Sequence, residues 1–113
     1  MKLVTAVIQP NALSAVREAL AQIDLNGITV TEVTGSGRQK GHSEVYRGAR
    51  YAVDFVPKVK IEIALVDEQV ETAVQAIVET ARTGNVGDGK IWVSPIDEAI
   101  RVRTGTVGEG ALQ

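Results

Sequence analysis

A chain of 113 residues is long enough to bury a hydrophobic core in one domain and too short for two domains of ordinary size. It contains no cysteine and one histidine, which excludes disulfides, a thiolate nucleophile, a zinc–cysteine site and a histidine-based metal cluster within one subunit. The lack of cysteine is compatible with a reducing cytoplasm. The formal net charge of −2 argues against a general nucleic-acid-binding protein, for which a strong basic excess is expected.

Residues 2–9 form an apolar segment that ends at Pro10, and we predict a strand there. The segment is too short for a signal peptide, and no apolar stretch in the chain approaches the length of a membrane-spanning helix. A helix is predicted next, with Asn11 as its N-cap and Gly27 just past its end. Its apolar residues recur at helical spacing, at Leu13, Val16, Leu20 and Ile23.

A long loop follows a predicted β-branched strand at residues 28–35. The loop covers about residues 36–54 and contains glycines, basic residues and two tyrosines. Compact domains rarely carry connections longer than roughly 12–15 residues unless these bind something. We therefore predict a recognition loop, and the alternative is a tolerated insertion.

Strict alternation after this loop predicts the clearest strand of the chain, at residues 58–65. One side of that strand is apolar, with Val59, Ile61, Ile63 and Leu65. A second helix is predicted from Asp67 to Arg82, with acidic residues at its dipole-favoured start, and a short last strand from Lys90 to Val93. The apolar stripe of that helix comprises Val70, Val74, Ile77, Val78 and Ala81.

The order strand–helix–strand, strand–helix–strand predicts an α+β, ferredoxin-like βαββαβ sandwich within a single domain spanning residues 1–113. Two helices can cover only one face of its four-stranded antiparallel sheet. The other face would carry a mixed set of side chains that includes Lys58, Lys60, Glu62 and Ala64. We infer an oligomer from this second face. The tail, residues 106–113, lacks periodicity and is predicted to be mobile.

Three glycines and a lysine crowd the segment from Thr83 to Lys90. Its letters nearly match G-x-x-x-x-G-K, but Ile91 stands where a P-loop needs Ser or Thr, and the context is helix-then-strand, so we reject a Walker A site. Closely spaced glycines let backbone N–H groups approach an anion, and Lys90 adds a charge. A phosphate cradle is one interpretation, and a helix C-cap followed by a glycine-rich turn is the other.

Arg101 and Arg103 would lie on one side of an extended segment, where paired guanidiniums suit phosphate oxygens. The alternative is a solvated charge pair. His42 is interpreted as a polar loop residue and not as a general base, and Trp92 as a core or interface residue.

These segments together closely resemble the P-II nitrogen-regulatory signal proteins over nearly the whole chain. The run from Gly37 to His42, followed by residues 46–51, is similar to the family's T-loop, here about residues 36–54. Residues 82–90 resemble its B-loop and residues 101–105 its C-loop. The resemblance implies a homotrimeric regulatory protein, not an enzyme, that binds ATP or ADP between subunits and acts by docking on targets.

The resemblance also implies the ligand sites. Nucleotide-binding residues would be Thr29, Gly37, Arg38, Glu62, Ala64, Gly87, Asp88, Gly89, Lys90, Arg101 and Arg103, the two arginines reaching the phosphates from a neighbouring subunit. The effector 2-oxoglutarate, bound with Mg-ATP, would contact Gln39, Lys40, Gly41, Lys58 and Gly87. Gln39 would also ligate Mg²⁺, which is reasonable because a hard cation prefers oxygen ligands.

Targets reached by this family through the T-loop include an ammonium channel, the nucleotidyltransferase that modifies glutamine synthetase, and transcription control. The implied location is cytoplasmic, with membrane contact only through a protein partner and no nucleic acid. Tyr51 resembles the tyrosine that receives a uridylyl or adenylyl group. The residue before it is usually acidic in the family but is Arg50 here, which reverses a charge beside the modification site.

Other functions fit the chain less well. An RNA-recognition domain has the same order of elements but stacks bases on aromatic residues, and strand 58–65 has none. A phosphate-ester enzyme would need a nucleophile or base, for which the sequence offers only Asp88 and Lys90. The closer alternative is a P-II-like nucleotide sensor with a different effector and target, such as a carbon-transport regulator.

Overall fold

The computed structural model describes residues 1–37, 43–46, 49–52 and 55–113, with side chains for 1–37 and 55–113. None of the helices in these ranges is long and apolar enough to cross a membrane. The elements are β1 (Lys2–Ile8), η1 (Pro10–Ala12), α1 (Leu13–Gln22), β2 (Thr29–Gly35), β3 (Ser43–Tyr46), β4 (Ala49–Ala52), β5 (Val56–Leu65), α2 (Asp67–Ala81), β6 (Gly89–Pro95) and η2 (Gly108–Leu112).

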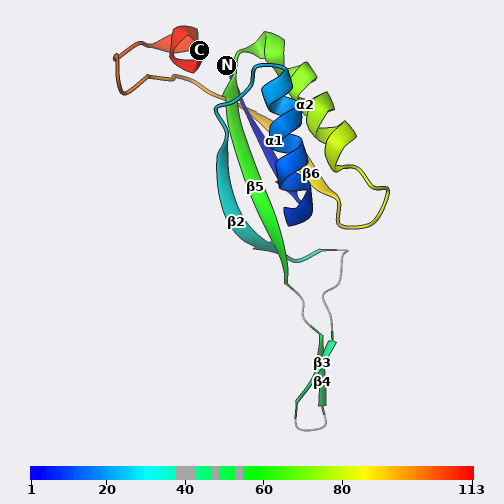
Figure 1. Ribbon diagram of the computed structural model, residues 1–113. Helices are drawn as coiled ribbons and strands as arrows, with labels where there is room; N and C mark the ends of the chain where they lie inside the picture. The colour runs from blue at the N-terminus through cyan, green and yellow to red at the C-terminus, as the bar shows by residue number, and fades with distance from the viewer. Residues whose placement is uncertain (38–42, 47–48, 53–54) are drawn as a thin grey trace.

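The main sheet has four strands in the order β2-β5-β1-β6, and every neighbouring pair is antiparallel. Helices α1 and α2 pack together on one face of the sheet (Figure 1). Strands β3 and β4 form a separate two-stranded sheet within the long loop. The predicted ferredoxin-like βαββαβ fold is therefore confirmed, with a hairpin that the sequence analysis did not predict.

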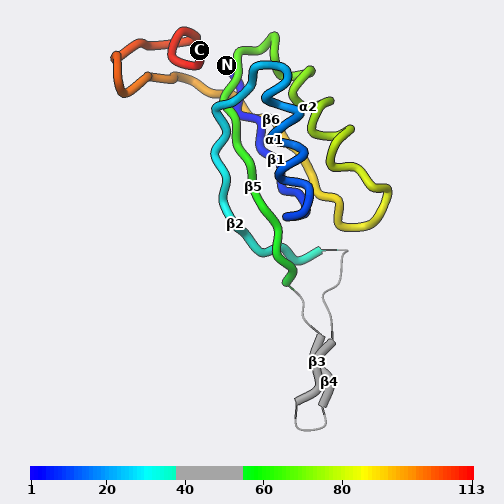
Figure 2. The backbone as a smooth tube through the Cα atoms, in the orientation of Figure 1, coloured from blue at the N-terminus to red at the C-terminus, as the bar shows by residue number. Residues whose placement is uncertain are grey.

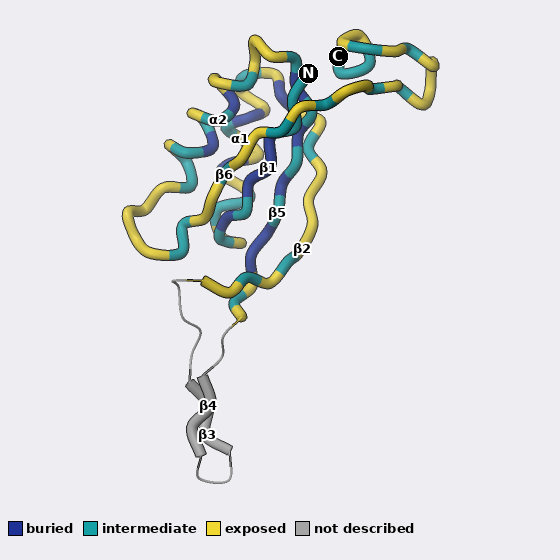
Figure 3. Tube along the Cα trace, turned by 180° about the vertical axis from the view of Figure 1, so that it is seen from behind, coloured by how far each residue is buried: buried dark blue, intermediate teal, exposed yellow. Residues whose placement is uncertain are grey.

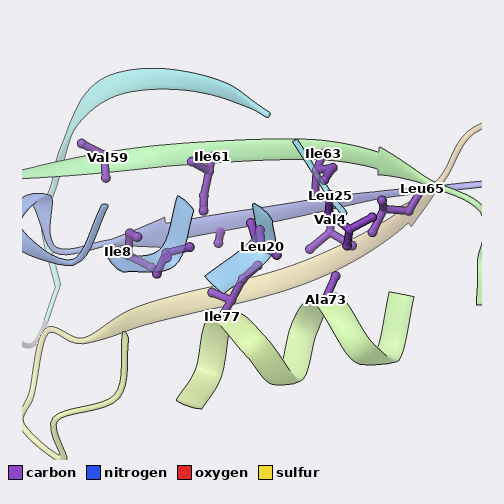
Figure 4. Packing of buried hydrophobic residues seen from close by; sticks show 12 residues of the cluster. Val4, Ile8, Leu20, Leu25, Val59, Ile61, Ile63, Leu65, Ala73 and Ile77 are labelled. Atoms are coloured by element: carbon purple, nitrogen blue, oxygen red, sulfur yellow. The ribbon is translucent and has the colours of Figure 1, made fainter. Parts of the chain in front are cut away.

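The core lies between the sheet and the two helices, as the close view in Figure 4 shows. The apolar side of β5 is buried as its alternation predicts. Ala73 was not part of the predicted apolar stripe of α2, yet none of its surface is exposed. A small side chain at that position lets the helix approach the sheet closely. The buried apolar residues are Val4, Ala6, Ile8, Val16, Leu20, Leu25, Val59, Ile61, Ile63, Leu65, Ala73 and Ile77.

The predicted ends of the first helix need correction. Asn11 lies inside the short turn η1, and the residue at the N-cap of α1 is Ala12, which makes no side-chain capping bond. Nor is Gly27 the residue that ends the helix, because α1 stops at Gln22 and Asp24 adopts the left-handed conformation with a φ of 62°. Aspartate tolerates this conformation better than most residues. The early turn directs Leu25 into the core.

The tail contains a short regular element that the sequence analysis did not predict. Residues 108–112 form the 3₁₀ helix η2, and Val107 bridges to Ile100 before it. The backbone tube in Figure 2 shows the chain leaving the sheet after β6 and turning back, so that the two termini lie near each other. The tail has no side-chain periodicity. Hydrogen bonds from Arg101 to main-chain oxygens of the tail, described below, hold it in this position.

The two edge strands remain largely open to solvent in the single subunit. Figure 3 shows burial concentrated in the central strands and exposure along β2 and β6. Three large apolar side chains on these strands, Val30, Trp92 and Val93, are 44%, 48% and 43% exposed. An isolated subunit therefore leaves apolar surface in water on both edges of its sheet.

Gly89 begins β6 opposite Ile8 and provides a stringent test of this packing. Its φ is +120°, and a Cβ at this position would lie 1.9 Å from the carbonyl oxygen of Val7. We expect Gly89→Ala to lower the free energy of unfolding by about 3 kcal/mol or more, because backbone must move to admit the methyl group. Urea unfolding followed by circular dichroism measures the effect.

Gly84→Ala is the matched control. Gly84 also has a positive φ, +90°, but a Cβ there would have no atom within 4 Å. Only the backbone strain of roughly 1–2 kcal/mol should remain. Equal costs for the two variants would contradict the close approach of Gly89 to β1.

Candidate functional site

The residues predicted to form a site lie near the two opposite ends of the sheet and on the sheet face between them. Strand β6 begins with Gly89 opposite Ile8 and finishes with Pro95 opposite Lys2. Six residue steps span roughly 20 Å along a strand. The glycine-rich loop (residues 83–90) therefore lies at one end, here called the glycine-loop end, and the segment after β6 starts from the other, the tail end.

The base of the long loop reaches the same glycine-loop end. There β2 ends and β5 begins, with Gly35 opposite Val56. Lys58 in β5 connects this base to the glycine-rich loop, because its Nζ donates a hydrogen bond of 2.6 Å to the carbonyl oxygen of Gly87. Figure 1 shows the two segments at the same end of the sheet. The Lys58 side chain thus joins the base of the long loop to the glycine-rich loop, about 30 residues further along the sequence.

Lys58 is more enclosed than its place on the polar side of the strand suggested. Only 8% of the residue is exposed, and the Cγ of its stem lies 3.5 Å from where a Cβ on Gly35 would be. Burial lowers the pKa of the Lys58 ammonium, and the nearby Asp88 carboxylate acts in the opposite direction. The group is a cation drawn partly out of water, where its interaction with an anion is strengthened.

Two further lysines share the sheet face of Lys58, the face turned away from the helices. Val7 pairs with Lys60 on one side and with Lys90 on the other, so the two lysine side chains stand in one row across the sheet. Lys60 forms a 3.8 Å ion pair with Glu62. At the glycine-loop end, this face therefore carries three cationic side chains, an arrangement that favours an anionic ligand.

The glycine-rich loop is held in shape by Asp88. Its Oδ2 accepts hydrogen bonds from the backbone N–H groups of Thr83, at 2.7 Å, and Gly84, at 2.9 Å. Its Oδ1 accepts one from the Thr83 hydroxyl at 2.5 Å. Both carboxylate oxygens are thus used inside the loop, and the loop's turns rely on glycines with positive φ at 84, 87 and 89. Asp88 therefore serves to shape the loop. The lysines are the groups at this end of the sheet that can bind an anion.

Thr29, Glu62 and Ala64 lie further along the open sheet face. Thr29 and Glu62 are directly opposite each other, and Ala64 is opposite Leu3, closer to the tail end. Lys58 and Glu62 are four residues apart on one strand, which places them roughly 13 Å apart. The sheet brings Thr29, Glu62 and Ala64 together but keeps them apart from the glycine-rich loop of the same subunit.

Arg101 and Arg103 begin beyond the tail end, and their segment is not extended as predicted. The Gly105 N–H donates to the Arg101 carbonyl at 2.7 Å, and the Arg101 N–H donates to the Thr106 carbonyl at 2.9 Å, which closes a tight turn. The prediction that both guanidiniums lie on one side of an extended segment is therefore wrong, because these backbone hydrogen bonds form a turn. Arg103 is exposed, whereas Arg101 is half-buried and its Nη2 donates to the carbonyl oxygens of Gly110, at 2.9 Å, and Gln113.

The predicted residues thus fall into three groups. Gly37, Lys58 and residues 87–90 lie at the glycine-loop end, Thr29, Glu62 and Ala64 lie along the open face, and the two arginines lie past the tail end. Arg38, Gln39, Lys40, Gly41 and His42 fall outside the described residues, and Tyr51 is described only as part of β4. Sequence analysis missed Thr83 as the partner of Asp88, although both residues lie in the glycine-rich loop.

Metal coordination by protein side chains alone finds no support in the described ranges, where no three His, Cys, Asp or Glu side chains converge. A hard cation at the glycine-loop end would need oxygen ligands from outside this set of side chains. The cationic sheet face favours an anionic ligand over a bare cation.

Comparison with known proteins places the chain among regulatory proteins. The family model described as "Nitrogen regulatory protein P-II" matches residues 1–106. A protein of that name from Cereibacter sphaeroides is 57% identical over 112 residues, covering 99% of this chain and 100% of the relative. Proteins of the same name from Bradyrhizobium diazoefficiens and Azospirillum brasilense are 59% and 54% identical over the same shares.

The Asp88 contacts predict a pH-dependent contribution to stability. The Thr83 hydroxyl and amide hold the pKa of the Asp88 carboxyl below its ordinary value of 3.8. A carboxyl with a lowered folded-state pKa stabilises the fold above 3.8, and this contribution is lost as the pH falls through the folded-state value. We expect Asp88→Asn to melt below the wild type at pH 7, with the difference shrinking below about pH 3.8.

Differential scanning calorimetry from pH 7 to pH 3 measures this convergence. Thr83→Val should show the same convergence, because it removes the hydroxyl donor to Asp88. Glu71→Gln, at an exposed carboxylate on α2, is the matched control. A difference between Asp88→Asn and the wild type that stays constant with pH would contradict the role given to the Asp88 carboxylate.

Proposed function

The chain belongs to the nitrogen regulatory protein P-II family and is a nitrogen-signalling regulator, and we propose that it works by binding ATP or ADP together with 2-oxoglutarate. In this proposal the ligands bind at the glycine-loop end and set the conformation of the long loop. The long loop then docks on target proteins. The protein acts as a regulatory ligand-binding protein and not by turnover.

The contact between Lys58 and Gly87 is the observation that carries the proposal. It joins the base of the long loop to the glycine-rich loop through one hydrogen bond of 2.6 Å. An anion that takes the Lys58 ammonium from the Gly87 carbonyl changes the contacts of both loops at once. A ligand can shift a conformational equilibrium only if it binds two states with different affinity, and this exchange provides such a difference.

The nucleotide would bind between subunits. Lys90 and the backbone of the glycine-rich loop would hold phosphates from one subunit, while Arg101 and Arg103 of a neighbour supply further cations. The roughly 20 Å between the two ends of the sheet supports a shared site, because one subunit cannot bring its own two ends together. Thr29, Glu62 and Ala64 would line the remainder of the cleft.

A closed homotrimer is the assembly we propose. Contacts between unlike surfaces generate a ring when the rotation closes, and the two ends of this sheet are such unlike surfaces. The exposed apolar side chains Val30, Trp92 and Val93 support this, since an oligomer would bury them.

Magnesium and 2-oxoglutarate complete the proposed site. The cation would be held by nucleotide phosphates, by 2-oxoglutarate and by Gln39, and 2-oxoglutarate would contact Lys40, Gly41 and Gly87 besides Lys58. The three lysines on the sheet face at the glycine-loop end, Lys58, Lys60 and Lys90, favour a ligand set with several negative charges. Binding of the nucleotide and the dicarboxylate would therefore be coupled through shared cations.

We further propose that the protein acts in the cytoplasm on the family's targets, such as an ammonium channel or the nucleotidyltransferase acting on glutamine synthetase. It would meet a membrane only through such a partner. Tyr51, in β4, would receive the uridylyl or adenylyl group. Because Arg50 precedes it, the added negative charge would be partly neutralised by its own neighbour.

Isothermal titration calorimetry of 2-oxoglutarate, with Mg-ATP present and then absent, tests the proposed function. The wild type should bind 2-oxoglutarate only with Mg-ATP. Lys58→Met should keep ATP binding and lose 2-oxoglutarate binding by 10-fold or more, because the charge-assisted contact to a carboxylate is removed.

Lys2→Met, on the neighbouring strand but at the tail end, is the matched control and should bind both ligands as the wild type does. Loss of both ligands in Lys58→Met, or of neither, would contradict the role of Lys58. If the wild type binds ATP but never 2-oxoglutarate, the chain is a nucleotide sensor with another effector.

The arginines give a separate test of the shared nucleotide site. Arg101→Ala and Arg103→Ala should each weaken ATP binding by about 1–3 kcal/mol if their contacts to phosphate are charge-assisted. Arg17→Ala, at an exposed arginine on α1, should leave the affinity unchanged. Sedimentation equilibrium should give three subunits for every variant. Unchanged ATP affinity in both Arg101→Ala and Arg103→Ala would contradict the phosphate contacts and favour the alternative, a solvated charge pair.

A further inference from the structure

The C-terminal tail (residues 108–113) binds the guanidinium of Arg101. The Nη2 of Arg101 donates to the carbonyl oxygen of Gly110 at 2.9 Å and to that of Gln113. The helix η2 brings both carbonyl groups to the same nitrogen. No hydrogen bond from the guanidinium of the nearby Arg103 appears among the described residues, and that side chain is exposed.

The choice of nitrogen matters for phosphate binding. A guanidinium grips two phosphate oxygens either end-on, with one N–H from each terminal nitrogen, or side-on, with Nε–H and one N–H of Nη2. Both arrangements need an N–H of Nη2. That nitrogen carries two N–H groups, and two tail carbonyls accept from it. While the tail is docked, Arg101 can therefore offer a phosphate only single hydrogen bonds.

We propose that the tail is an internal competitor for the phosphate-binding face of Arg101 and that nucleotide binding requires its release. This rests on the proposed function, in which Arg101 contacts nucleotide phosphates. The Gly110 acceptor is a neutral carbonyl, whereas a phosphate offers several charged oxygens that form stronger hydrogen bonds with a guanidinium. The docked tail is thus a contact that a nucleotide can displace.

The packing of the tail suits a reversible contact. None of the residues in η2 is buried. Leu112 and Gln113 line a cavity of about 530 Å³, together with the connection between α1 and β2 and the end of β5. A short helix with few buried contacts belongs to the part of a fold that opens at low free-energy cost. Replacing Leu112, which lines this cavity, by a polar residue should therefore release the tail without unfolding the sheet.

Reciprocity follows from the competition. If the tail lowers the affinity for ATP, then ATP lowers the occupancy of the docked tail by the same factor. Arg103 should not take part, because the tail carbonyls are bonded to Arg101. The two arginines therefore respond differently to removal of the tail, which separates competition from a general effect on folding.

Calorimetric titration of ATP with Mg²⁺ tests this inference on the full chain, on a variant that ends after Gly108, and on Leu112→Ser. We expect both changes to tighten ATP binding about 3- to 10-fold. Ala111→Ser, one residue away and outside the lining of the cavity, is the matched control and should bind ATP as the wild type does. In the Arg101→Ala background the truncation should gain nothing, while in the Arg103→Ala background the gain should persist.

Each result decides the matter. Unchanged or weaker ATP binding in both tail variants, with a wild type that binds ATP, overturns the competition and leaves the proposed function intact. A gain that persists in the Arg101→Ala background also overturns it, because the tail would then act elsewhere. Failure of every variant and the wild type to bind ATP overturns the proposed nucleotide site, and the competition with it.

Discussion

The hydrogen bond from Lys58 to the Gly87 carbonyl is the contact on which the proposed signalling depends. It runs from the start of β5, just after the long loop, to the middle of the glycine-rich loop, and it places a cation where little water reaches it. Without this contact, the two loops would meet at one end of the sheet only as neighbours. With it, an anionic ligand that engages Lys58 must change the contacts of both.

The glycine-rich loop can receive Lys58 because other contacts hold its shape. Asp88 closes the loop onto Thr83 and Gly84, and Gly89 lets the following strand approach the Val7 carbonyl too closely for any side chain. The glycine-rich loop therefore has a defined shape without a ligand. Such preorganisation lowers the entropic cost of binding a ligand there.

The length of the sheet imposes the second constraint. Cations at the glycine-loop end and arginines past the tail end lie too far apart for one subunit to use both on one ligand. In the proposed trimer, a neighbouring copy would turn this separation into a shared site, and the tail bound to Arg101 would control how much of that site is available. In this proposal, ligand binding, assembly and the position of the tail are linked equilibria.

Local patterns in the sequence determined the four strands of the main sheet and its two helices, because side-chain periodicity and glycine spacing depend on near neighbours. The alternation at residues 58–65, the stripe of the second helix and the glycine-rich segment at 83–90 all predicted what the structure contains. Only the tertiary structure decided which groups meet: the burial of Lys58 against Gly87, the turn at Asp24, and the capture of the aperiodic tail by Arg101. Each of the two side-chain contacts joins a side chain to a backbone carbonyl, and no residue type marks which carbonyl will be in reach. That is set by how the strands are aligned and where the chain turns back.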